Sequence, residues 1–150
     1  MHNLHGEFET ETMGQLLLFS ARGPWNDETM RNGVVKMSRL ISNLGTQSSW
    51  AQLSCLYGES LMPPSTFEIF IKQTIIRKQR GLSFLAIVIT DTDIGLTIRS
   101  QLSYCYDAAG VEHAFVDTVE EAIECLSLKG YDFDSTDVAQ FFKTHDFTYR

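Results

Sequence analysis

Residues 80 to 126 read RGLSFLAIVITDTDIGLTIRSQLSYCYDAAGVEHAFVDTVEEAIECL. The apolar run from Leu82 to Thr90 predicts a strand that is buried on both faces, and residues 111 to 116 predict a second, shorter strand. Between these strands, apolar residues recur at helical spacing, at Ile94, Ile98, Leu102 and Cys105. A strand, a helix and a second strand form a β-α-β crossover, so this stretch indicates a parallel sheet that is covered by helices.

The N-terminal residues continue the alternation of strands and helices. Residues 7 to 13 show the two-residue period of a half-exposed strand, and residues 15 to 22 read as a second strand that forms a hairpin with it. Asn26 or Asp27 is expected to cap a first helix. Gly45 is expected to end that helix, whose apolar face carries Met30, Val34, Met37, Ile41 and Leu44.

Three further helix starts are visible after the first helix. The strand predicted over residues 50 to 56 leads to a helix whose first turn, Ser65 to Glu68, has the pattern of a capping box. Thr118 is expected to begin a helix in the same way after the closing strand. Asp134 or Ser135 is expected to cap a last short helix.

Together these elements predict an α/β fold: a mixed sheet of four to five strands, about four helices packed against it, and a C-terminal helical extension. We expect residues 1–128 to form the domain and residues 129–150 to form the extension. Phe141, Phe142 and Phe147 would make a large apolar patch if they were exposed. The extension is therefore expected to pack either on its own domain or on a second subunit in a homodimer.

The composition is that of a globular protein with an acidic balance. Of the 150 residues, 43% are hydrophobic and 21% are charged, and the formal net charge is −7. Binding of a phosphate backbone needs concentrated positive charge, so nucleic acid is not expected as a partner. The one basic cluster, Arg77, Lys78 and Arg80, is interpreted as charge that opposes the negative end of a helix dipole.

The apolar runs and the cysteines bear on the compartment. The longest apolar run, Phe84 to Ile89, is much shorter than the roughly 20 residues that cross a bilayer, so no membrane insertion is expected. The N-terminal sequence lacks the basic and apolar regions of a secretory signal. Cys55, Cys105 and Cys125 are odd in number and far apart, which indicates buried, reduced thiols and a cytoplasmic protein.

Four segments carry a resemblance to a known family. They are Gly23-Pro24-Trp25-Asn26, residues 50 to 56, Arg80-Gly81 before residues 82 to 89, and residues 111 to 116 followed by Thr118-Val-Glu-Glu-Ala-Ile123. In this order they resemble the STAS superfamily (sulfate transporter and anti-sigma-factor antagonist), particularly its stand-alone, sporulation-antagonist-like bacterial members. The resemblance covers residues 7 to 128 and implies a non-catalytic protein-interaction or regulatory module.

The phosphorylation motif of that family does not occur here. Antagonists of the family carry Asp-Ser-(Ser/Thr)-Gly where the central strand meets the second helix, and a kinase phosphorylates that serine. The corresponding residues 58 to 66 have no Asp before a Ser and contain two prolines. Ser65 lies at a predicted helix N-terminus, where a phosphate would meet free N–H groups, although a plain N-cap also explains this residue. We expect contact with a partner or ligand in this mixed apolar and polar loop, at Tyr57, Glu59, Ser60, Leu61, Met62, Ser65 and Thr66.

Two aspartates offer a different kind of chemistry. Asp91 and Asp93 follow a buried strand, where two carboxylates can hold Mg²⁺ for phosphoryl transfer or can cap the following helix. The four histidines lack the spacing of a metal site, and no known nucleophile motif occurs. No catalytic set, resident metal or cofactor is therefore predicted.

Three functions remain open at this point. The first is the non-catalytic interaction or regulatory module, whose protein partner the sequence does not identify. The second is a carrier or sensor of a small apolar, lipid-like ligand held between the sheet and the helices, which a dry and fully packed interior would exclude. The third is a Mg²⁺-dependent phosphotransfer enzyme that uses Asp91 and Asp93.

Overall fold

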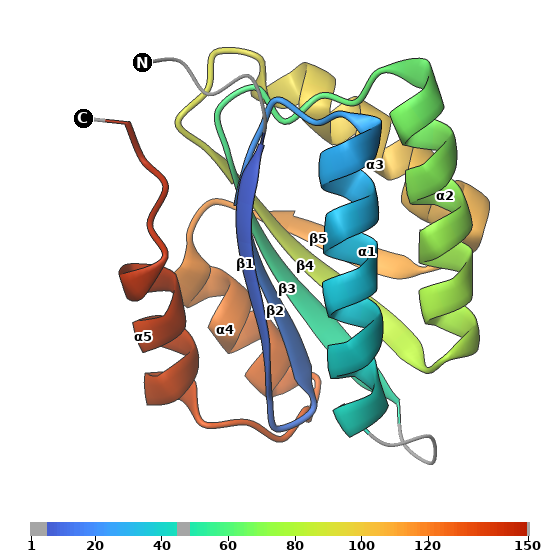
Figure 1. The fold of residues 1–150 in the computed structure, drawn as a ribbon. Helices are drawn as coiled ribbons and strands as arrows, with labels where there is room; N and C mark the ends of the chain where they lie inside the picture. Colours follow the sequence, from blue (N-terminus) through green and yellow to red (C-terminus); the bar gives the residue numbers. More distant parts are fainter. Residues whose placement is uncertain (1–5, 45–48, 150) are drawn as a thin grey trace.

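The computed structural model describes residues 6–44 and 49–149, and within them it contains five strands and five α-helices (Figure 1). The strands are β1 (Glu7–Met13), β2 (Leu16–Arg22), β3 (Trp50–Tyr57), β4 (Leu82–Thr90) and β5 (Glu112–Val116). The helices are α1 (Asp27–Ile41), which the 3₁₀ turn η1 (Ser42–Leu44) follows, α2 (Pro64–Gln79), α3 (Gly95–Ala109), α4 (Val119–Leu128) and α5 (Ser135–Thr144). No helix in the described ranges is both long and apolar enough to span a membrane.

One mixed sheet contains the strands in the order β1-β2-β3-β4-β5. β1 and β2 are antiparallel, with Glu7 opposite Arg22 and Met13 opposite Leu16, which confirms the predicted hairpin. β2, β3, β4 and β5 are parallel to one another. The predicted α/β class, with its mixed sheet and C-terminal helix, is therefore confirmed.

Helices cover both faces of this sheet. The chain moves from β2 to β5 one strand at a time in a single direction, so right-handed crossovers place the three connecting helices on the same face. This face carries α1, α2 and α3, whereas α4 and α5 lie against the opposite face, as Figure 1 shows. Each face has a hydrophobic cluster of its own.

β3 lies at the centre of the sheet and is buried along its whole length. Because side chains alternate between the two faces of a strand, Trp50, Gln52, Ser54 and Leu56 share the face that the α1–α3 layer covers. The residues between them belong to the cluster under α4 and α5. Two polar side chains of β3 therefore lie inside an otherwise apolar layer.

The C-terminal extension packs on the α4 side of the sheet. Val138 of α5 is fully buried, and Phe141 and Phe142 are each 5% exposed. These side chains share a cluster with Leu126 of α4 and with the strands beneath it. All of these contacts lie within one chain, and the homodimer through residues 129–150 stays a prediction.

Side-chain caps begin three of the helices, as predicted. The Asn26 Oδ1 accepts a hydrogen bond from the backbone N–H three residues further on at 2.8 Å, at the start of α1. Thr118 and Asp134 make the same kind of contact at the starts of α4 and α5. α3 ends at Gly110, whose φ of 71° is left-handed and suits glycine. The predicted helix end at Gly45 falls outside the described residues.

The capping box predicted from Ser65 to Glu68 is wrong. α2 begins at Pro64, with Pro63 in the N-cap position and without a side-chain cap. The fixed φ of proline suits the first position of a helix, so the helix starts one residue before Ser65. The Ser65 hydroxyl donates instead to Asp27 Oδ1, at the start of α1.

Candidate ligand-binding site

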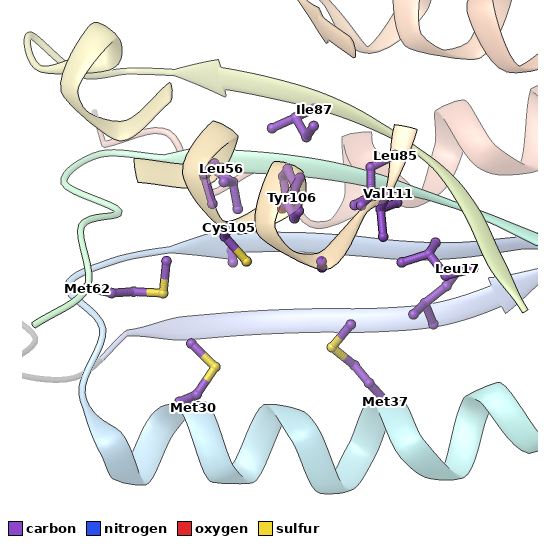
Figure 2. Packing of buried hydrophobic residues seen from close by; sticks show 14 of the residues in the cluster. Leu17, Met30, Met37, Leu56, Met62, Leu85, Ile87, Cys105, Tyr106 and Val111 are labelled. Atoms are coloured by element: carbon purple, nitrogen blue, oxygen red, sulfur yellow. The ribbon is translucent and has the colours of Figure 1, made fainter. Parts of the chain in front are cut away.

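A cavity of about 40 Å³ lies inside the α1–α3 layer. A space of this size holds more than one water molecule, because one water needs roughly 10–15 Å³. β3 contributes its polar residues to the cavity, and α1, α2, α3 and the loop before α2 complete the lining. Figure 2 shows Met30 and Met37 pointing from α1 toward the strands, with Met62 at the same end of the layer as Met30.

The lining is mainly apolar and deformable. Three of the five methionines of the chain, Met30, Met37 and Met62, belong to it. Trp25, Leu56 and Leu102 add rigid apolar surface. Methionine is unbranched and polarizable and adapts to irregular shapes, so such a lining can accommodate an apolar group.

The polar residues of β3 leave one acceptor without a partner. Gln52 and Ser54 are 3% and 2% exposed. The Gln52 Nε2 donates to Ser54 Oγ at 2.9 Å, which leaves the amide oxygen on the other side. The Gln52 Oε1 has no hydrogen-bond partner among residues 6–44 and 49–149. A buried acceptor in this state costs about 1–3 kcal/mol, so it is a place where a ligand donor would be stabilised.

Arg77 of α2 brings a positive charge into the same cavity. Arg77 is only 6% exposed, and it lines the cavity together with Gln52. Nη2 donates to Thr74 Oγ1 at 3.0 Å, and Nη1 reaches only the weak acceptor Met37 Sδ at 4.0 Å. Nε has no partner, and no Asp or Glu within the described ranges forms an ion pair with this guanidinium.

The charge of Arg77 is not removed by its surroundings. Burial lowers the pKa of the Arg77 guanidinium. Burial raises the pKa of the neighbouring Tyr106 phenol, so Tyr106 stays neutral and does not supply an anion for Arg77. Arginine stays protonated in proteins, so the positive charge is buried with the face of the Phe70 ring 5.7 Å away and without a carboxylate partner among the described residues. Arg77 and Lys78 do lie in the last turn of α2, as the helix-dipole interpretation requires, but the Arg77 side chain is buried. Arg80 does remain at the surface, where it donates to Ser38 on α1.

The cavity comes closest to solvent between α1 and α2. Val34 on α1 and Phe70 and Gln73 on α2 line it and are half-buried. The other residues that α1 and α2 contribute to the lining are buried. Among the described strand residues of the lining, Phe19 of β2 is the one further residue that is half-buried.

The lining contains few ionisable side chains. The described lining residues include one charged side chain, Arg77, and no Asp, Glu, His or Cys. The lining hydroxyls of Ser54, Ser60 and Tyr106 therefore have no carboxylate or imidazole beside them in the described lining to act as a general base. The arrangement combines a fixed cation and a fixed hydrogen-bond acceptor in an apolar space, which is suited to holding an anion with an apolar body.

Two of the predicted contact residues belong to this cavity. Ser60 and Met62 are 2% and 7% exposed and line it. Gln101 of α3 holds the loop, since its side chain accepts from Met62 N at 3.0 Å and donates to Met62 O at 2.9 Å. Glu59 is exposed and Leu61 is half-buried. The loop thus has an inner side within the cavity and an outer side in solvent.

Ser65 and Thr66 join the starts of α1 and α2. Their hydroxyls donate to Asp27 Oδ1 at 2.9 and 2.6 Å. The bond from Thr66, followed by the bond from Ser65, holds the pKa of Asp27 below its ordinary value. Ser65 is exposed, and a phosphate on it would face the Asp27 carboxylate. Phosphorylation of Ser65 stays a prediction.

Tyr57 lies on the other face of the sheet, away from the cavity. It is 5% exposed, burial raises its pKa, and the edge of its ring meets Phe147 at a centroid distance of 6.1 Å. Cys55 on the same face is also buried, and burial raises the pKa of its thiol to about 11. This thiol is therefore protonated at neutral pH, as expected for a buried cysteine. Cys105 is also buried, whereas Cys125 is half-buried, so the prediction of burial holds for two of the three cysteines.

Asp91 is part of an ion pair and does not cap α3, which begins without a side-chain cap. Its carboxylate pairs with Arg22 and accepts from Tyr149 N at 3.1 Å. Arg22 also donates to Phe147 O at 3.0 Å and lies 3.4 Å from the centre of the Tyr149 ring. Asp93 is exposed. Across residues 6–44 and 49–149, no three His, Cys, Asp or Glu side chains are grouped to hold a metal ion.

The sequence contains a signal for the cavity residues that our sequence analysis did not use. Gln52 and Ser54 are polar at a two-residue spacing within a strand that is otherwise apolar, so they share one buried face. Arg77 follows Phe70 and Thr74 at spacings of seven and three residues, which places it on the inner face of its helix. Polar residues at core positions of neighbouring elements indicate a buried polar site.

The fold and cavity define an α/β domain that encloses a polar, cationic site beneath three helices. The sequence matches no protein-family model and no curated protein. The assignment to the STAS superfamily therefore stays a proposal.

The Arg22–Asp91 pair predicts a pH-dependent contribution to stability. The bonds from Arg22 and from Tyr149 N lower the pKa of Asp91 below its ordinary value of 3.8. A lowered carboxyl pKa stabilises the folded state above the ordinary value, and this contribution disappears as the pH falls through the folded-state pKa. We expect Asp91→Asn to lower the Tm at neutral pH and the difference from wild type to shrink below about pH 4. Thermal unfolding between pH 3 and 7 measures this, with Asp93→Asn as the control near wild type. A Tm difference that is the same at every pH would contradict it.

The uncompensated Arg77 predicts a stability change opposite to that of an ordinary core substitution. We expect Arg77→Met to leave the free energy of unfolding unchanged or to raise it by up to about 4 kcal/mol, because it removes an unpaired buried charge. Leu102→Ala, at a 2%-exposed position in the same lining, should cost about 2–5 kcal/mol. Urea unfolding of both variants makes the comparison. A clear loss of stability in Arg77→Met would contradict this prediction. It would show that the contacts of Arg77 in the structure offset the cost of burying its charge.

Proposed function

We propose that this protein is a non-catalytic ligand-binding module, a carrier or sensor that holds a small, largely apolar molecule in the cavity beneath α1, α2 and α3. One observation carries the proposal. Arg77 Nε and Gln52 Oε1 are buried in the lining of an apolar cavity, and neither has a partner among the described residues. Folded proteins satisfy nearly all buried polar groups through protein groups, water or ligands, so a pair of exceptions at one cavity supports a ligand whose polar groups would take the place of water.

The cost of the arrangement supports a role beyond folding. An apolar residue at position 77 would fill the same space without a desolvation penalty, so a solely structural role does not account for arginine. The deformable methionines around it fit a space that changes shape when it is filled. A fully packed interior, which would have excluded a ligand carrier, is not what this layer contains.

A regulatory interaction with a protein partner is a second proposal, and the loop before α2 supports it. Ser60 and Met62 line the cavity, whereas the neighbouring Glu59 is exposed. A ligand that displaces Met62 would therefore alter the surface at Glu59. The partner contact that the STAS resemblance implies would then depend on occupancy of the cavity.

The Mg²⁺-dependent phosphotransfer alternative has less support. The Asp91 carboxylate is engaged by Arg22 and by a backbone N–H, so a metal ion would compete with an existing cation. Asp93 would then be the one carboxylate of the two that is left to hold Mg²⁺.

Trp25 provides a direct reporter of cavity occupancy. It lines the cavity, whereas Trp50 is held elsewhere in the layer by a bond from its Nε1 to Arg80 O at 3.0 Å. We expect 1-hexanol or hexanoate to cause a saturable change in the fluorescence of the wild type. The same change should persist in Trp50→Phe and disappear in Trp25→Phe.

Two other results of this titration would contradict binding in the cavity. A change that survives in Trp25→Phe would place the binding outside the cavity. The absence of a saturable change with both probes, in wild type and in Trp50→Phe, would contradict the proposed function.

A further inference from the structure

We infer that the ligand is a monocarboxylate with an otherwise apolar body and with a hydrogen-bond donor, a hydroxyl or an amide N–H, a few atoms from its carboxylate. The inference deepens the proposed function and rests on it. It concerns which chemical class of molecule the cavity selects.

The number of charges selects a monoanion. Arg77 is the one charged group among the described residues of the lining, and it carries a single positive charge. A carboxylate neutralises that charge, whereas a phosphate dianion would leave one negative charge buried, at a large desolvation cost. The planar fork of a guanidinium also matches the two oxygens of a carboxylate. The free Nε–H and the weakly engaged Nη1 are the donors available for such a contact.

The orientation of Gln52 selects a donor on the ligand. Its Nε2 is committed to Ser54 Oγ, so the free group is the acceptor Oε1. An acceptor cannot be satisfied by the carboxylate that pairs with Arg77. A hydroxyl or an amide N–H on the ligand satisfies it, and a plain alkyl chain leaves it unpaired.

The topology places these two polar groups toward one end of the cavity. β3 and β4 are parallel, so the connecting helix α2 runs against them, and the end of α2 lies beside the start of β3. Arg77 is near the end of α2 and Gln52 is near the start of β3. Met30 and Met62 lie at the other end of the layer (Figure 2). The carboxylate and its adjacent donor would therefore sit at the Arg77 end, with the apolar body among the methionines.

Three six-carbon probes separate these requirements: 1-hexanol, hexanoate and 3-hydroxyhexanoate, each titrated against the wild type at neutral pH. The carboxylate should strengthen binding about tenfold or more over the alcohol, which is the scale of a hydrogen-bonded buried charge. The 3-hydroxyl should add about a further fivefold, the scale of one neutral hydrogen bond. Arg77→Met should abolish the first difference, and Gln52→Leu should abolish only the second.

The outcomes distinguish this inference from the function on which it rests. Equal binding of hexanol and hexanoate to the wild type would contradict the inference that the ligand carries a carboxylate, while the proposed function would stand. Equal binding of hexanoate and 3-hydroxyhexanoate would contradict the inference that a donor on the ligand bonds to Gln52 Oε1. Failure of all three probes to bind would contradict the proposed function itself. The wild-type comparisons need no variant, so a substitution that prevents folding leaves the test intact.

Discussion

A guanidinium does not give up its proton inside a protein, so a buried arginine needs a balancing anion. Two arginines are buried among residues 6–44 and 49–149, and they differ in their partners. Arg22, 9% exposed, pairs with Asp91. Arg77, 6% exposed, has no carboxylate among the described residues and keeps one donor, Nε, entirely free. The first arginine has its partner within the chain, and we propose that the second pairs with a molecule from outside it.

The two faces of the sheet also differ in how they are packed. Under α4 and α5 the packing is built from branched and aromatic side chains, and residues 145–149 close the edge through Arg22 and the Tyr57 ring. Under α1, α2 and α3 the layer contains methionines, a polar pair on β3 and open volume. One face is thus filled by its own side chains, and the other contains a cavity whose methionine side chains can adapt to different shapes.

The fold could be predicted from the sequence because its signals are local and repeated. The apolar run of β4, the caps at Asn26, Thr118 and Asp134, and the glycine at 110 each act within a few residues. The candidate site depends on contacts between distant residues, which no local pattern reports. In the sequence, Arg77 looks the same as a surface arginine at a helix end. Its inward orientation becomes visible only when α2 packs against α1.

The two errors at helix starts have the same origin. Ser65 and Asp91 have the residue types of caps, and each instead bonds to a partner far away in the sequence, Asp27 and Arg22. Polar side chains near a helix start accept whichever partner the tertiary structure brings closest. Loop and helix-end residues are therefore the places where a sequence-based expectation is most easily displaced by packing.

The free Nε–H of Arg77 is the atom on which the account depends, and it can be observed directly. ¹⁵N NMR of the wild type, with the Arg77 Nε–H signal assigned by its loss in Arg77→Met, reports whether this group acquires a hydrogen-bond partner. The account predicts that saturating hexanoate shifts this signal and slows its exchange with water, while 1-hexanol does neither. A signal that hexanoate leaves unchanged, although the Trp25 fluorescence responds to the same titration, would contradict the claim that Arg77 receives the anion.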